Sequence, residues 1–163
     1  MPALARVQQA ARLGLKIAAV LAFLAPLATR VVLGAAFYLT GSGKWAHFDN
    51  TVTFFTELGI PFPEANAAFV ASLELVGGIF LFVGLLTRVM ATGLASTMVV
   101  ALLTADKERF LESWSTASEA SPTDISAFVF LLFLLWLALF GPGPVSLDRF
   151  LGRWLKTDTE PAK

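Results

Sequence analysis

Residues 67–105 form an apolar stretch that constrains the fold more than any other feature of this sequence. Only Thr87-Arg88 separates its two halves. A single helix over the whole stretch would be roughly 58 Å long at ~1.5 Å per residue, about twice the ~30 Å thickness of a hydrocarbon layer. The sequence therefore predicts two successive helices that turn back on each other near Thr87-Arg88.

The rest of the chain fits a membrane protein with four spans. Apolar residues make up 56% of the 163 residues and charged residues only 15%. We predict an all-α, membrane-embedded four-helix bundle that forms a single domain over residues 1–163, with no soluble domain. The predicted spans are residues 13–39, 67–86, 89–105 and 125–140.

Both ends of the predicted bundle have distinctive sequences. The start of the chain is basic and then apolar, as in a signal peptide, but the apolar run resumes at Val31, so we interpret it as the first span. The sequence GPGP at 141–144 ends the last span, because proline cannot continue a helix. Residues 149–156, RFLGRWLK, predict a short amphipathic helix on an anionic membrane surface, with a solvated tail as the alternative.

The distribution of basic residues predicts the orientation. Cytoplasmic loops of membrane proteins carry an excess of Lys and Arg. The side that holds both termini carries most of them: Arg6, Arg12, Lys16, Arg88, Arg149, Arg153, Lys156 and Lys163. The opposite side carries only Lys44, Lys107 and Arg109, beside eight acidic residues. Both termini are therefore predicted to be cytoplasmic.

Two charged residues lie well inside the predicted spans, Arg30 in the first and Glu74 in the second. A charge at the centre of a bilayer costs about 2.5–3.5 kcal/mol on insertion scales, so such residues face the bundle interior and find a partner. We expect Arg30 to pair with Glu74. The pair would either specify helix register alone or bind a polar ligand group or a proton.

Glycines near these charges predict how the helices meet, because glycine lets membrane helices approach closely. The candidates for helix packing are Gly34, Gly77, Gly78 and Gly84. Lys44, next to Trp45, is interpreted as an anchor at the membrane interface, with a buried polar or ligand-binding role as the alternative.

Several kinds of chemistry have no support in these residues. The sequence has no cysteine and one histidine, so we expect no haem, iron–sulfur or zinc site. It contains no phosphate-binding loop and no recognisable catalytic constellation, so catalytic residues stay unassigned and enzyme activity is left open. The net charge of zero gives no reason to expect nucleic acid as a partner.

Residues 30–148 nevertheless carry an ordered set of motifs: TRVVLGAAFYLTGSGKW, LGIPFPEANAAFVASLELVGGIFLFVGLLTRV and GPGPVSLDR. This set resembles the DoxX family of small four-helix bacterial membrane proteins. The resemblance implies a multi-pass protein of the bacterial inner (cytoplasmic) membrane.

The resemblance also implies an accessory or anchoring subunit of a membrane-associated redox system. Its expected partners are the lipid bilayer and either a redox protein or a second copy of the chain. The alternative is a quinone-binding catalytic subunit or a small-molecule carrier that uses Arg30 and Glu74. A quinone is the candidate cofactor, since it would suit an aromatic-rich pocket within the bundle.

Overall fold

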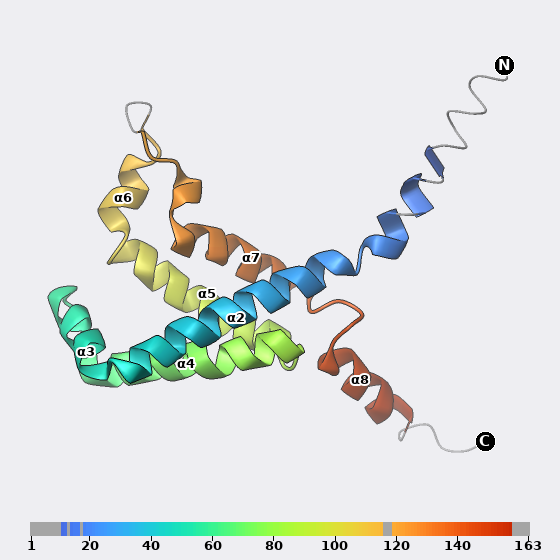
Figure 1. Ribbon diagram of the computed structural model, residues 1–163, viewed down its shortest axis with the longest axis horizontal. Helices are drawn as coiled ribbons and strands as arrows, with labels where there is room; N and C mark the ends of the chain where they lie inside the picture. Colours follow the sequence, from blue (N-terminus) through green and yellow to red (C-terminus); the bar gives the residue numbers. More distant parts are fainter. Residues whose placement is uncertain (1–10, 13, 17, 116–118, 158–163) are drawn as a thin grey trace.

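The structure is a computed structural model that describes residues 11–12, 14–16, 18–115 and 119–157. Arg6, Lys163 and the predicted start of the first span at residue 13 lie outside these ranges. Within them every regular element is a helix, which confirms the all-α prediction. The elements are α2 (Leu24–Ala46), α3 (Phe48–Glu57), α4 (Pro63–Val83), α5 (Thr87–Leu103), α6 (Lys107–Glu112), the 3-10 turn η1 (Pro122–Asp124), α7 (Ser126–Phe140) and α8 (Leu147–Thr157) (Figure 1).

The four long helices pack as two pairs. Helix α2 lies along α4 and α5 lies along α7, while contacts between α4 and α5 join the pairs (Figure 1). The largest core cluster fills the space between the pairs, with Phe37 from α2, Leu81 from α4, Leu94 from α5 and Leu134 from α7. Apolar residues from all four helices therefore supply the packing.

In the described part of the chain, two helical segments are long and apolar enough to cross a membrane. One is Gly14–Ala46, which comprises α2 and residues before it, and the other is α4 (Pro63–Val83). Helices α5 and α7 are also apolar but shorter, about 26 and 22 Å at ~1.5 Å per residue. Large apolar side chains cover much of the exterior, among them Val32, Leu39, Phe69, Leu103 and Leu139. An exterior with so many exposed large apolar side chains suits contact with lipid rather than with water.

The turn between α4 and α5 lies earlier than the sequence predicted. It occupies residues 84–86, and Thr87 and Arg88 form the first turn of α5. Gly84 adopts a left-handed conformation (φ 74°), which glycine tolerates without a steric penalty. Leu86 also has a positive φ of 47°, which is uncommon for a residue with a side chain.

The end of the first predicted span differs as well. The first span was predicted to end at residue 39, but the polar segment TGSGKWA continues α2 to Ala46. The segment that follows, which lies between the first and second predicted spans, contains the helix α3. Both differences matter, because they place Lys44 on a helix and α3 beside it.

Helix α8 forms where the sequence predicted an amphipathic segment, and its residues Phe150 and Trp154 are exposed. It leads away from the paired helices (Figure 1). Its start is fixed by Asp148, whose carboxylate oxygens accept hydrogen bonds from the backbone N–H groups of Leu86 (2.6 Å) and Thr87 (2.9 Å). Asp148 thereby links α8 to the first turn of α5.

Candidate functional site

Glu74 on α4 forms an ion pair with Lys44 on α2. The Lys44 Nζ lies 2.5 Å from Glu74 Oε2. The Glu74 side chain is 4% exposed and that of Lys44 is 28% exposed. A carboxylate buried to this degree requires a charge partner, and Lys44 supplies it while its stem covers apolar surface.

The predicted pair of Arg30 with Glu74 is wrong, and the register of α2 against α4 explains why. A Cβ atom built on Gly34 would lie 2.8 Å from the carbonyl oxygen of Gly78, and one built on Gly41 would lie 2.9 Å from that of Ala71. These contacts place about residue 40 of α2 opposite Glu74. Lys44 is one helical turn from that level, whereas Arg30 is about ten residues, or ~15 Å, away.

Arg30 instead lies at the other end of the helix pair. It is 2% exposed, and its Nη1 donates a hydrogen bond to the carbonyl oxygen of Pro142 (3.3 Å) in the loop after α7. The guanidinium also lies against Gly84, where any side chain would displace it. Its Nε has no hydrogen-bond partner among the described residues.

The four glycines singled out from the sequence have three different roles. Gly34 and Gly78 face each other and bring the backbones of α2 and α4 into contact. Gly77 faces α5 instead, where a Cβ atom would lie 3.1 Å from Leu94. Gly84 ends α4 and makes room for Arg30.

The Lys44–Glu74 pair lies on the wall of a pocket of about 280 Å³, enclosed by α2, α3, α4 and α5. The remaining lining is largely apolar and includes three aromatic rings. The lining residues are Lys44, Phe54, Phe55, Leu58, Ile60, Asn66, Phe69, Val70, Glu74, Ser96, Thr97, Met98, Val100, Ala101, Thr104 and Ala105. An apolar cavity with a few converging polar groups is the usual form of a small-molecule site.

Lys44 is the principal hydrogen-bond donor that this pocket offers a ligand. The hydroxyl groups of Ser96, Thr97 and Thr104 donate to backbone carbonyls of α5, and the Asn66 amide donates to Pro61. A lysine ammonium has three N–H donors, of which Glu74 takes one. No group of three His, Cys, Asp or Glu side chains within the described ranges is arranged to hold a metal ion.

Sequence reasoning missed the contribution of α3 to this site. Phe55 of α3 is buried and, with Phe54, forms one wall of the pocket. The signal was present, since Phe48, Val52 and Phe55 follow helical spacing and Asp49 lies in the first turn, where an acid is favourable. Trp45, expected at the interface, stacks on Phe48 with ring centroids 5.1 Å apart where α2 meets α3.

Comparison with known proteins identifies the family of this chain. A family model described as DoxX matches residues 25–107, which include both Lys44 and Glu74. The chain is 31% identical to Putative oxidoreductase CatD of Bacillus subtilis, over 77% of this chain and 85% of that protein. It is 35% identical to Uncharacterized membrane protein Rv3486 of Mycobacterium tuberculosis, over 76% and 79% of the two chains.

A third relative is Inner membrane protein YphA of Escherichia coli, 29% identical over 76% of this chain and 87% of that protein. No solved structure matches the chain. The names of the three relatives describe membrane proteins and an oxidoreductase, and the matched segments span most of each chain.

Proposed function

The chain belongs to the DoxX family of membrane proteins, and on that premise we propose that it is an accessory subunit of a membrane-associated redox system that binds a quinone beside Lys44 and Glu74. The observation that carries the proposal is the buried ion pair on the wall of an apolar pocket. The name of the relative CatD supports the link to oxidoreduction.

The pocket has the features that a quinone ring requires. A quinone offers two carbonyl acceptors and no strong donor, and Lys44 supplies N–H groups beyond the one bound to Glu74. The rings of Phe54, Phe55 and Phe69 provide apolar contact surface. The volume of about 280 Å³ suits a single substituted ring, so an attached apolar tail would extend out of the pocket toward lipid.

The ion pair also determines what the chain can contribute chemically. When bound, a quinone would supply two-electron redox chemistry, with the electrons from the partner oxidoreductase and the two protons from solvent. Glu74 orients the Lys44 ammonium and balances its charge in a site of low dielectric constant. Lys44 then holds one quinone oxygen through a charge-assisted hydrogen bond.

The proposed membrane arrangement is a four-helix bundle with α2, α4, α5 and α7 as the spans and both termini in the cytoplasm of a bacterial cell. The excess of basic residues on the side of α8 and of the α4–α5 turn supports this orientation. The Lys44–Glu74 pocket then lies toward the outer face. The family's membrane location and the inner-membrane relative YphA support the placement.

Calorimetric titration of the purified full chain with a short-tailed benzoquinone tests ligand binding. We expect saturable binding that Glu74→Gln and Lys44→Met each weaken at least tenfold. Glu64→Gln is the matched control, because Glu64 lies on the same helix, is exposed and does not line the pocket. Absence of binding to the natural chain, or equal binding by all three variants, would contradict a quinone site here.

The accessory role is tested separately by mild cross-linking in native membranes followed by purification of the chain. We expect an oxidoreductase to co-purify, and we expect Glu74→Gln to leave that association unchanged because the pair is internal. Recovery of only the chain itself, with quinone binding intact, would support a quinone-binding protein that works without such a partner.

A further inference from the structure

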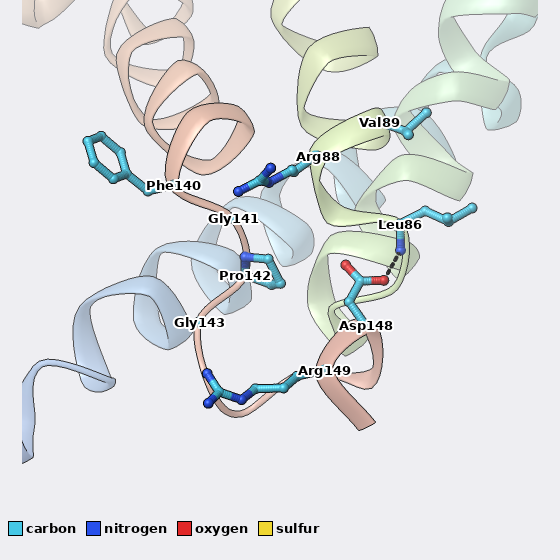
Figure 2. A pocket seen from close by; sticks show the side chains of 9 residues that line it. All are labelled: Leu86, Arg88, Val89, Phe140, Gly141, Pro142, Gly143, Asp148 and Arg149. Atoms are coloured by element: carbon cyan, nitrogen blue, oxygen red, sulfur yellow. Dashed lines mark hydrogen bonds between the residues drawn. The ribbon is translucent and has the colours of Figure 1, made fainter. Parts of the chain in front are cut away.

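A second hollow, of about 520 Å³, opens at the other end of α4, where the α4–α5 turn meets the loop between α7 and α8. Arg88 reaches it from the first turn of α5 and Arg149 reaches it from α8. In Figure 2 the Arg88 side chain extends toward Gly141, whereas the Arg149 side chain extends toward the loop beyond Gly143, so the two approach the loop at opposite ends. This hollow shares no residue with the Lys44–Glu74 pocket.

Two of the three charged side chains that line the hollow, those of Arg88 and Arg149, are positive. Both Arg88 and Arg149 are exposed, and neither side chain has an ion pair or hydrogen bond to any residue that the structure describes. The carboxylate on the wall, Asp148, already binds two backbone N–H groups through its two oxygens. Arg30, buried behind the loop, adds a third guanidinium group close by.

Apolar side chains flank the two arginines. Phe140, which is 72% exposed, Val89 and Leu86 all line the hollow with large exposed surfaces. The adjoining helix α8 exposes Phe150 and Trp154 in addition. A phosphate ion in water would gain nothing from these surfaces, whereas a phospholipid presents an anionic phosphate directly beside apolar chains.

We propose that this hollow binds the phosphate of an anionic phospholipid, with Arg88 and Arg149 as its charge partners. A guanidinium group binds phosphate through paired N–H donors, so one arginine can hold the phosphate while the other adds positive charge to the same hollow. Phe140 and Val89 contact the start of the acyl chains. The site fixes the loop after α7 and the start of α8 at the membrane surface, and it does not depend on the proposed quinone pocket.

Native mass spectrometry of the full chain in neutral detergent, with phosphatidylglycerol and phosphatidylcholine added in equal amounts, tests this proposal. We expect one phosphatidylglycerol to be retained in preference to phosphatidylcholine. Arg88→Gln and Arg149→Gln should each weaken its binding about fivefold, as removal of one basic residue near an anionic lipid does. The double variant Arg88→Lys with Arg149→Lys keeps the charges but loses the paired N–H donors, so it should lose part of the binding.

Arg153→Gln is the matched control, since it removes the same charge from the same helix but does not line the hollow. We expect it to change binding less than twofold. An equal loss with Arg153→Gln would show diffuse surface electrostatics and overturn the site, as would equal retention of the two lipids. Displacement of the lipid by the same concentration of inorganic phosphate would assign the site to free phosphate and overturn the lipid as occupant.

Discussion

Lys44 and Glu74 lie on neighbouring antiparallel helices with their charged atoms 2.5 Å apart, and both face a pocket that α3 closes. The ion pair offsets the cost of burying a carboxylate in an apolar helix. The nearly buried Glu74 binds the ammonium group of Lys44, which keeps some contact with solvent. It also places a hydrogen-bond donor inside an apolar cavity. Helix packing and the proposed ligand binding therefore depend on the same two side chains.

The first prediction concerns the energetic coupling of this pair. Lys44→Met and Glu74→Gln should each lower the free energy of unfolding by about 1–3 kcal/mol, because each leaves its partner without a charge-assisted bond. In the double variant the free energy of unfolding should fall by less than the sum of the two single losses, with a coupling energy of about 0.5–3 kcal/mol. Equilibrium unfolding in detergent, followed by circular dichroism, measures all three.

Lys107→Met combined with Glu64→Gln provides the control for this cycle. Both residues are exposed and form no ion pair with a described residue, so their effects should simply add. Additive losses at Lys44 and Glu74 as well would show that the two charges do not interact.

A second prediction addresses the close contact between α2 and α4. Gly34→Ala should destabilise the protein by about 1–3 kcal/mol, because the new methyl group would meet the backbone of Gly78 and Phe82 and force the helices apart. Gly43→Ala on the same helix has open space around it and should be neutral or should stabilise by up to about 1 kcal/mol. The prediction is checked by comparing the thermal unfolding midpoints of the two variants. Equal midpoints would contradict the close contact of Gly34 with the backbone of α4.

A third prediction concerns the cap that Asp148 provides for α5. Asp148→Ala should cost about 1–2 kcal/mol, as the loss of a helix cap does, and should speed hydrogen exchange at the amides of Leu86 and Thr87. Asp148→Asn keeps one acceptor oxygen, so its stability and its exchange rates should lie between those of the natural chain and those of Asp148→Ala. Asp106→Ala serves as control because Asp106 precedes α6 without a side-chain cap bond; unchanged exchange in Asp148→Ala would exclude the capping role.

A fourth prediction tests the orientation in the membrane. The chain has no cysteine, so single cysteines can be labelled without background. In intact cells a membrane-impermeant maleimide should label Glu119→Cys, in the segment between α6 and η1, and should leave Gly152→Cys on α8 unlabelled until the cells are permeabilised. The reverse pattern would invert the topology, and labelling of both in intact cells would place the two segments on the outer side together.

Much of the helical framework could be predicted from the residues alone. The run at 125–140 lies within one residue of α7, because a proline-glycine motif follows it and no charged residue interrupts it. The segment 149–156 lies wholly within α8. The end of α2 and the existence of α3 were missed, since the glycines and polar residues of TGSGKWA are turn formers in isolation. Packing of Gly41 on the backbone of α4 overrides that local preference.

The sequence by itself determined that this chain is helical, that it is too apolar for water, and that Arg30, Lys44 and Glu74 each needed a partner or an interface. These conclusions depend on composition and local periodicity, which are properties of the sequence alone. Only the tertiary structure decided that Glu74 pairs with Lys44 while Arg30 binds the loop after α7. The physical reason is register: backbone contacts at Gly34, Gly41 and Gly78 set how far α2 slides along α4, and a slide of a few turns changes which charges meet.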